Sequence, residues 1–233
     1  GGRPSGRGRA ARGAAMSSRR MPAAVPMPSP LTMALKRAFD VVVSGAGLVL
    51  LSPLLLAIAA WIKLDSRGPV FFRQERVGRH GVPFRIHKFR TMVVDASARG
   101  GELTIGADPR ITRAGLALRR TKLDELPQLI DVFVGTMSLV GPRPEVPRYV
   151  AMYPPAVREK VLSVRPGITD SASIEFRDES ALLARSDDPE REYTQVVMPA
   201  KLRCAVDYVE RASLWLDLLL IARTLKAIAW NRR

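Results

Sequence analysis

Two adjacent carboxylates, Asp124 and Glu125, stand directly before an apolar segment, residues 126–134. Pro127 suits the first turn of a helix, because its missing N–H costs nothing there. Apolar side chains then recur at helical spacing, and Gly135 can end the helix. The spacing therefore predicts an acidic pair at a helix N-terminus, where unpaired backbone N–H groups and the helix dipole favour an anion.

Basic residues surround this pair in the sequence. Arg119, Arg120 and Lys122 precede it, and Arg143 follows within a stiff Pro-Arg-Pro. Two acids among four cations, at a natural anion site, indicate phosphate chemistry. A structural alternative stays open on spacing alone: an acidic N-cap on a core helix, with basic neighbours that are merely solvated.

Length and charge narrow the possible partners. The 233 residues suit one domain with appendages, and the net charge of +15 favours anionic partners such as nucleic acid, phospholipid or phosphorylated substrates. Residues 1–34 contain no acid and are rich in Gly, Ala, Pro, Ser and Arg, so we expect a disordered basic tail. The single cysteine, Cys204, excludes an internal disulfide.

Residues 41–62 carry no charge, and as a helix they would extend about 33 Å, the thickness of a bilayer core. Ser52 and Pro53 lie at the midpoint, where proline is expected to kink the helix. Basic residues flank both ends: Lys36, Arg37, Lys63 and Arg67. Because such residues stay cytoplasmic, residues 35–63 are predicted to form a re-entrant helix–break–helix. A kinked spanning helix is the alternative.

Residues 64–200 are polar and mixed, and we expect them to form a cytoplasmic domain. Within it, residues 69–77 and 82–89 predict a small β-hairpin, and residues 165–170 a turn. Residues 198–230 are expected to be one long helical segment. The C-terminal region, residues 201–233, contains Trp215 and Trp230 and suits an amphipathic helix at the membrane interface, although plain core packing fits as well. The predicted fold class is α+β, mostly helical, in a monotopic membrane protein.

Several short motifs follow one another in a fixed order. They are KRAFD at 36–40, the apolar helix broken by Ser52 and Pro53, GPVFFRQERVG at 68–78, KFRTM at 88–92, LRRTKLDELPQ at 118–128, MSLVGPRP at 137–144 and RPGIT at 165–169. By these motifs the chain resembles the bacterial sugar transferases, the monotopic phosphoglycosyl transferases that load a sugar phosphate onto polyprenyl phosphate. Asp131 stands where Asn is common in that family, and Asp170 where many members have Gly. Both departures leave the subgroup and the sugar open.

The resemblance implies a covalent mechanism with Asp124 as the nucleophile. Asp124 would attack the sugar-linked phosphorus of a nucleotide diphosphate sugar, expected to be a uridine derivative, and release a nucleoside monophosphate. Polyprenyl phosphate would then displace the sugar phosphate from the enzyme. Asp124 and Glu125 are expected to hold Mg²⁺, and Glu125 could instead assist with the acceptor's proton. The candidate phosphate ligands are Lys88, Arg90, Arg119 and Arg143, with Arg120 and Lys122 as weaker candidates.

The resemblance also implies a place in the cell and a set of partners. We expect the cytoplasmic face of the bacterial inner membrane, contact with membrane lipids, and the first membrane step of a surface glycan or glycoconjugate pathway. A homodimer is one option for the assembly. A membrane-tethered nucleic-acid binder is a rival reading, but no nucleic-acid fold motif is present, so we expect no nucleic-acid partner. A non-catalytic scaffold is the other rival, and the intact acidic pair argues against it.

Overall fold

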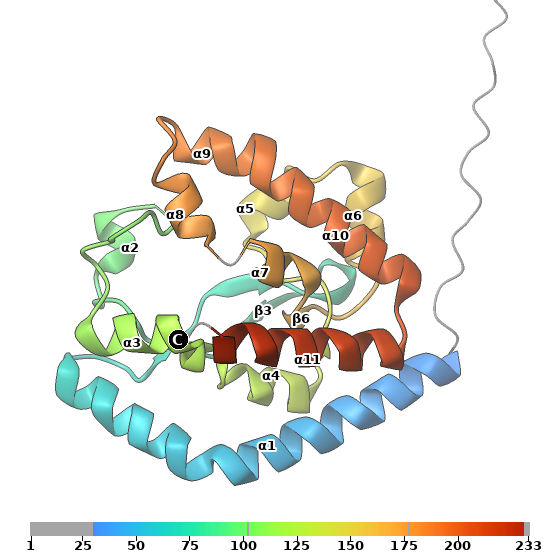
Figure 1. Cartoon of the computed structure of the whole chain (residues 1–233), viewed down its shortest axis with the longest axis horizontal. Coiled ribbons are helices and arrows are strands. Elements are labelled where there is room, and N and C mark those ends of the chain that lie inside the picture. Colours follow the sequence, from blue (N-terminus) through green and yellow to red (C-terminus); the bar gives the residue numbers. More distant parts are fainter. Residues whose placement is uncertain (1–29, 102, 177, 231–233) are drawn as a thin grey trace, which may run out of the picture.

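A computed structural model describes residues 30–101, 103–176 and 178–230 of the chain. Most of the predicted tail, residues 1–29, lies outside the described residues. The described part is mostly helical with three two-stranded sheets, in agreement with the predicted α+β class. One long helix runs along one side of the molecule, and the other elements pack together beside it (Figure 1).

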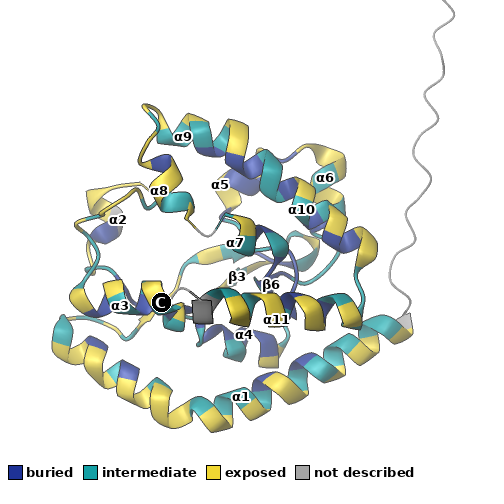
Figure 2. Ribbon diagram, viewed as in Figure 1, coloured by how far each residue is buried: buried dark blue, intermediate teal, exposed yellow. Residues whose placement is uncertain are grey.

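That long helix is α1 (Pro30–Asp65), which starts within the predicted tail, so residues 30–34 are helical. Figure 1 shows that α1 bends near its middle, the part of the helix that contains Pro53. Within the described residues it is the one helix long and apolar enough to cross a membrane, by length and composition only. Its outer face is largely exposed (Figure 2), with Leu50 at 78% and Leu56 at 71%.

Polar residues near the start of α1 attach it to the other elements. Lys36 donates to the carbonyl of Val140 at 2.9 Å, and Arg37 donates to the carbonyl of Val132 at 2.6 Å. The carboxylate of Asp40 accepts the N–H of Leu139 at 3.1 Å. The KRAFD motif therefore anchors the apolar helix to the polar domain.

The predicted hairpin is confirmed, in two short pieces. Its strands are β1 (Phe71–Phe72), β2 (Glu75–Val77), β3 (Pro83–Arg85) and β4 (Lys88–Phe89). β1 pairs antiparallel with β4, and β2 with β3, around a 3₁₀ turn at Arg79–Gly81. The hairpin returns the chain at β4 close to the acidic pair, because β4 packs against the turn that holds it.

Three short helices follow, α2 (Ala96–Arg99), α3 (Arg113–Thr121) and α4 (Gln128–Val134). α3 approaches the backbone after β4 so closely that a Cβ on Gly115 would lie 2.0 Å from the carbonyl oxygen of Thr91. Gly135 ends α4 at φ +97°, the left-handed conformation that glycine adopts without strain. The predicted C-terminus of this helix is confirmed.

β5 (Ser138–Val140) and β6 (Gly167–Thr169) form a parallel pair of strands. The prediction of a turn at residues 165–170 is therefore wrong. A three-residue strand is too short to show alternation in the sequence, and parallel pairing joins segments that are far apart in the chain. Gly167 is needed here, since a Cβ on it would lie 2.1 Å from the nitrogen of Gly141.

The C-terminal half is helical. Its elements are α5 (Pro147–Val150), α6 (Pro155–Val161), α7 (Ser171–Glu175), α8 (Glu179–Leu183), α9 (Pro189–Glu192), a π-helix at Tyr193–Val197, α10 (Met198–Arg211) and α11 (Leu214–Trp230). The expected single helix over 198–230 is wrong, because Ser213 interrupts it and its hydroxyl caps α11 by accepting the N–H of Leu216 at 3.2 Å. α10 packs into the core, whereas α11 keeps exposed apolar side chains such as Trp215 at 76%.

Three apolar clusters hold these elements together. The first lies between α5, α6, the π-helix and α10, the second joins β5 to α4, α10 and α11, and the third joins α1 to α3 and β4. The third cluster consists of Ile58, Ile62, Phe89 and Leu118. It fixes the C-terminal arm of α1 against α3, which precedes the acidic pair, and against β4.

Candidate active site

The acidic pair lies in a 3₁₀ turn, Leu123–Glu125, between α3 and α4. Lys122, at φ +58°, turns the chain sharply out of α3. Because α4 begins only at Gln128, the carboxylates lie just ahead of the helix and not at its first residues. Asp124 is 2% exposed and Glu125 9%, so both need partners or ligands.

Lys88 is the cation shared by the two carboxylates. Its Nζ lies 2.9 Å from Oδ2 of Asp124 and 3.3 Å from Oε1 of Glu125. Lys88 starts β4, and the antiparallel pairing of that strand with β1 brings it to a turn 36 residues away in the chain. The structure therefore brings together the predicted pair and one predicted phosphate ligand.

Arg143 forms a second, nearly bidentate pair with Glu125. Its Nη2 lies 2.5 Å from Oε1 and its Nη1 3.4 Å from Oε2. Burial alone would raise the pKa of Glu125, but the charges of Arg143 and Lys88 outweigh it and hold that pKa well below its ordinary range. The carboxylate of Glu125 in turn raises the pKa of Arg143. Glu125 is therefore ionised throughout the range in which proteins work.

Replacing Arg143 by glutamine should change the pKa of Glu125 and therefore how the stability of the fold depends on pH. Without that charge, burial has more weight and the pKa of Glu125 rises. A carboxylate with a depressed pKa stabilises the fold above its ordinary pKa of 4.5, and this contribution is lost only as the pH falls through the folded value. In Arg143→Gln the folded pKa lies closer to 4.5, so this variant should lose less stability than the original protein as the pH falls from 6 to 3, which thermal unfolding over that range would measure. Arg148→Gln, which removes an exposed arginine from the same segment, is the matched control. Parallel pH profiles for the two variants would contradict the assignment.

Asp124 keeps one oxygen without a partner. Its Oδ1 is buried and has no hydrogen bond, although Oδ2 is held by Lys88. An unpaired buried acceptor is costly unless a ligand supplies a donor or a cation. The described residues contain no cluster of three or more His, Cys, Asp and Glu side chains, so a metal here would need oxygens from a substrate. That donor set fits Mg²⁺, which commonly takes one or two carboxylates and substrate phosphates.

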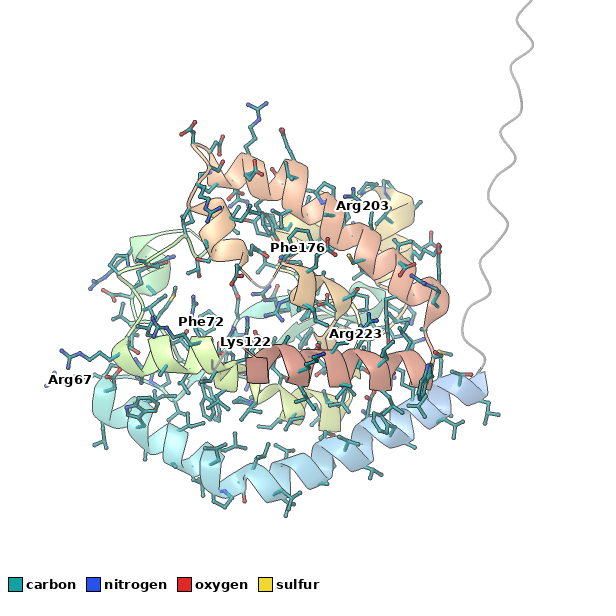
Figure 3. The ribbon with its side chains drawn as sticks, viewed as in Figure 1. Arg67, Phe72, Lys122, Phe176, Arg203 and Arg223 are labelled. Atoms are coloured by element: carbon teal, nitrogen blue, oxygen red, sulfur yellow. The ribbon has the colours of Figure 1, made fainter. Side chains whose placement is uncertain are left out.

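The carboxylates open onto a cavity of about 1460 Å³. Lys88, Arg119 and Arg143 line it together with the acidic pair. Figure 3 labels three more lining residues, Phe72, Lys122 and Phe176, which come from the hairpin, the end of α3 and the end of α7. A site of this size and mixed lining can hold a nucleotide-sized anion.

The other predicted phosphate ligands differ in what they contact. Arg119 lines the cavity and donates to the hydroxyls of Thr91 at 3.0 Å and Thr104 at 3.2 Å. Arg90 also lines it, but its guanidinium donates to the carbonyl of Pro69 and to the hydroxyl and carbonyl of Ser66. These contacts tie β4 to the end of α1 and favour a structural role for Arg90. Phosphate binding by either arginine stays a prediction.

Asp131 and Asp170, the two residues that differ from the family pattern, hold the backbone beside Lys88 and at Arg143. Asp131 accepts the backbone N–H of His87 at 2.8 Å and pairs with its Nδ1 at 2.7 Å, directly beside Lys88. Asp170 accepts the backbone N–H of Arg143 at 3.3 Å and caps α7 by accepting the N–H of Ser173 at 2.6 Å. The sequence marked both acids as unusual, but the partner of each lies far away in the chain, so their roles were missed.

Comparison with known proteins agrees with this geometry. The sequence profile described as bacterial sugar transferase matches residues 31–231. The chain is 37% identical over 204 residues to the UDP-N-acetylgalactosamine-undecaprenyl-phosphate N-acetylgalactosaminephosphotransferase of Aeromonas hydrophila, covering 87% of this chain and 45% of that protein. It is 38% identical over 193 residues to the UDP-glucose:undecaprenyl-phosphate glucose-1-phosphate transferase of Escherichia coli, covering 82% of this chain and 39% of that protein.

A shorter relative matches over more of its length. The UDP-glucose:undecaprenyl-phosphate glucose-1-phosphate transferase of Caulobacter vibrioides is 36% identical over 205 residues, which cover 87% of this chain and 73% of that protein. The chain spans less than half the length of the two other relatives. Because the profile covers nearly all of the described residues, the chain belongs to the bacterial sugar transferase family.

Proposed function

We propose that this protein transfers a sugar phosphate from a uridine diphosphate sugar to polyprenyl phosphate and releases uridine monophosphate. The observation that carries the proposal is the buried Asp124, with one oxygen held by Lys88 and the other free, beside a large cavity lined by cations. The names of the relatives support the two substrate classes, with undecaprenyl phosphate as the acceptor. Those names include two different sugars, so the proposal stops at the substrate class.

In the first half-reaction, Oδ1 of Asp124 attacks the phosphorus that carries the sugar. A bond forms between that oxygen and phosphorus, and the bond from phosphorus to the bridging oxygen of the diphosphate breaks. The nucleoside monophosphate leaves with that oxygen. In the second half-reaction a phosphate oxygen of the polyprenyl phosphate attacks the same phosphorus and releases Asp124 as a carboxylate.

The surrounding charged groups position the reactants and neutralise charge, on which phosphoryl transfer depends. Lys88 orients Asp124 through Oδ2 and leaves Oδ1 free to react. Arg143 keeps Glu125 ionised and in place. Glu125 would hold Mg²⁺ together with substrate oxygens, and the metal would neutralise diphosphate oxygens and stabilise the leaving monophosphate; Asp124 could contribute to this metal site only before its Oδ1 reacts.

The enzymatic proposal has a direct test. Purified full-length protein, supplied with Mg²⁺, polyprenyl phosphate and a panel of uridine diphosphate sugars, should release uridine monophosphate with at least one sugar. We expect more than one uridine monophosphate per protein molecule only when polyprenyl phosphate is present. No release from any member of the panel would contradict the proposed reaction.

We further propose that α1 enters and leaves the membrane on the cytoplasmic face of the bacterial inner membrane. The bend near Pro53 and the polar anchors at the start of α1 support a helix whose two arms both return to the domain. A re-entrant helix would place the cavity at headgroup level, where the phosphate of a polyprenyl acceptor lies.

Cysteine labelling tests this topology. In a Cys204→Ala background, cysteines at Ala34 and Arg67, both exposed positions flanking the apolar stretch, should react with an impermeant thiol reagent only from the cytoplasmic side. Arg67 points away from the domain in Figure 3, so a reagent can reach it. Labelling of the two sites from opposite sides would mean that α1 spans the membrane.

A further inference from the structure

A second, smaller cavity lies at the start of α1, and it shares no lining residue with the first. Its volume is about 50 Å³, several times what one water molecule needs. It is bounded by the first turns of α1, the start of β5, the segment before β6 and the connection between α10 and α11. In Figure 1 that connection lies close to the N-terminal end of α1.

Three arginines line this cavity, Arg37, Arg79 and Arg165, and the terminal nitrogens of Arg37 are already bound to the carbonyls of Val132 and Phe133. Asp40 is the carboxylate among the lining residues, and it accepts a backbone N–H from Leu139. Lys36 also lines the cavity, but Asp217 balances its charge at 2.5 Å. The lining therefore holds an excess of positive charge that no described side chain neutralises.

The arginines are close enough to act on one another. Burial lowers the pKa of Arg165, and the charges of Arg37 and Arg79 lower it further. Nε of Arg165 donates to the carbonyl of Gly135 at 2.8 Å, and Nε of Arg79 donates to that of Ser163 at 2.8 Å. Their terminal nitrogens have no acceptor among the described residues. Two guanidinium forks are thus free to bind an anion.

Ser138 provides an independent observation. It is 0% exposed and lines the cavity, and its hydroxyl oxygen is buried without any hydrogen-bond partner. A buried hydroxyl without a partner costs free energy unless a ligand accepts a hydrogen bond from it. A phosphate oxygen is such an acceptor, and it also matches the planar donor forks of the arginines.

The surroundings of the cavity are apolar and exposed. Leu31 is 69% exposed, Leu35 55% and Trp215 76%, and they stand on the two helices that border it. Exposed apolar side chains beside a basic cavity are typical of a surface at the membrane interface. A phosphate bound here would therefore come with acyl chains that cover this surface.

We infer that the cavity formed by Arg37, Arg79, Arg165 and Ser138 binds the phosphate of an anionic phospholipid headgroup, at a site separate from the active site. The bound lipid reduces the excess positive charge, satisfies Ser138, and joins the start of α1 to the α10–α11 connection. Such a lipid sets the depth of α1 in the membrane without taking part in the transfer reaction.

Thermal stabilisation of the detergent-purified full-length protein tests this site. Short-chain phosphatidylglycerol should raise the unfolding temperature at lower concentration than phosphatidylcholine of equal chain length. In Arg79→Gln its apparent affinity should fall at least fivefold. The matched control, Arg203→Gln, removes an exposed arginine on the outer side of α10 (Figure 3) and should bind like the original protein.

Two further variants keep the result interpretable. Ser138→Ala removes a hydroxyl without a protein partner, so it should fold as well as the original protein and still bind the lipid several-fold more weakly. Arg143→Gln alters the active site and should leave the lipid effect unchanged. Equal affinity in the original protein, Arg79→Gln and Ser138→Ala would overturn the inference, as would loss of the effect in Arg143→Gln alone. If inorganic phosphate at the same concentration raises the unfolding temperature equally, the site binds a soluble anion and the inference of a lipid is overturned.

Discussion

Asp124→Asn is expected to abolish the release of uridine monophosphate, with a loss of at least about 1,000-fold, because a carboxamide cannot form the covalent bond to phosphorus. The change keeps the shape of the side chain, so Lys88 can still approach the retained oxygen. The protein should therefore fold and enter membranes normally. This is the largest effect on activity that we expect from a single substitution.

The covalent step can be observed without the acceptor. Incubation with the nucleotide sugar and Mg²⁺, without polyprenyl phosphate, should add one sugar phosphate to the protein, detected by intact mass and mapped to the peptide that contains Asp124. Asp207→Asn makes the same chemical change at an exposed carboxylate paired with Arg211, and should leave both adduct and turnover intact. An adduct of normal yield in Asp124→Asn would refute the assignment of the nucleophile.

Lys36→Met is expected to cause the largest loss of stability. Asp217 is 0% exposed, and Lys36 at 2.5 Å and the hydroxyl of Tyr208 at 2.8 Å are its partners. Removing one partner of a buried pair typically costs about 3–5 kcal/mol, because a charge is left uncompensated. For a chain of this size the unfolding temperature should fall by at least about 6 °C.

The pH dependence of that loss has a definite sign. Burial raises the pKa of Asp217, and the charge of Lys36 opposes the shift, so Lys36→Met should raise the pKa further. A carboxyl with a raised pKa destabilises the fold as the pH rises above its unfolded value of 3.8. The difference between Lys36→Met and the original protein should therefore shrink on acidification.

Two variants check this interpretation by thermal unfolding. Lys36→Met combined with Asp217→Asn removes both charges and should recover most of the lost stability, since an amide can still accept from Tyr208. Lys160→Met breaks a more exposed ion pair with Glu210 and should cost about 1 kcal/mol or less. If the double variant is no more stable than Lys36→Met, the loss does not come from an uncompensated charge.

The candidate acidic pair could be located from the sequence by local rules, whereas its proposed catalytic role came from the family resemblance. Adjacent acids before an apolar segment of helical period, with Gly135 at its end, predicted both the pair and the helix that follows it. The uncharged segment with a central Pro53 predicted the long bent helix in the same way. Each of these signals depends on neighbours within a few residues, where chain geometry limits what the backbone can do.

The environment of those residues was decided by the tertiary structure. Lys88 reaches Asp124 only because β4 pairs with β1. Asp131 of α4 contacts His87, the residue before β4, across 44 positions of the chain. Arg90 looked equivalent to Lys88 in the sequence, but it turns toward Ser66 and the end of α1. Lys88 and Arg90 are two residues apart, so strand alternation alone would put both side chains on one face. β4 ends at Phe89, and the packing of distant elements decides where the side chain of Arg90 goes. The sequence alone determined which groups could react, and the three-dimensional packing determined which cations hold them, how burial balances their charges, and which oxygen of Asp124 stays free.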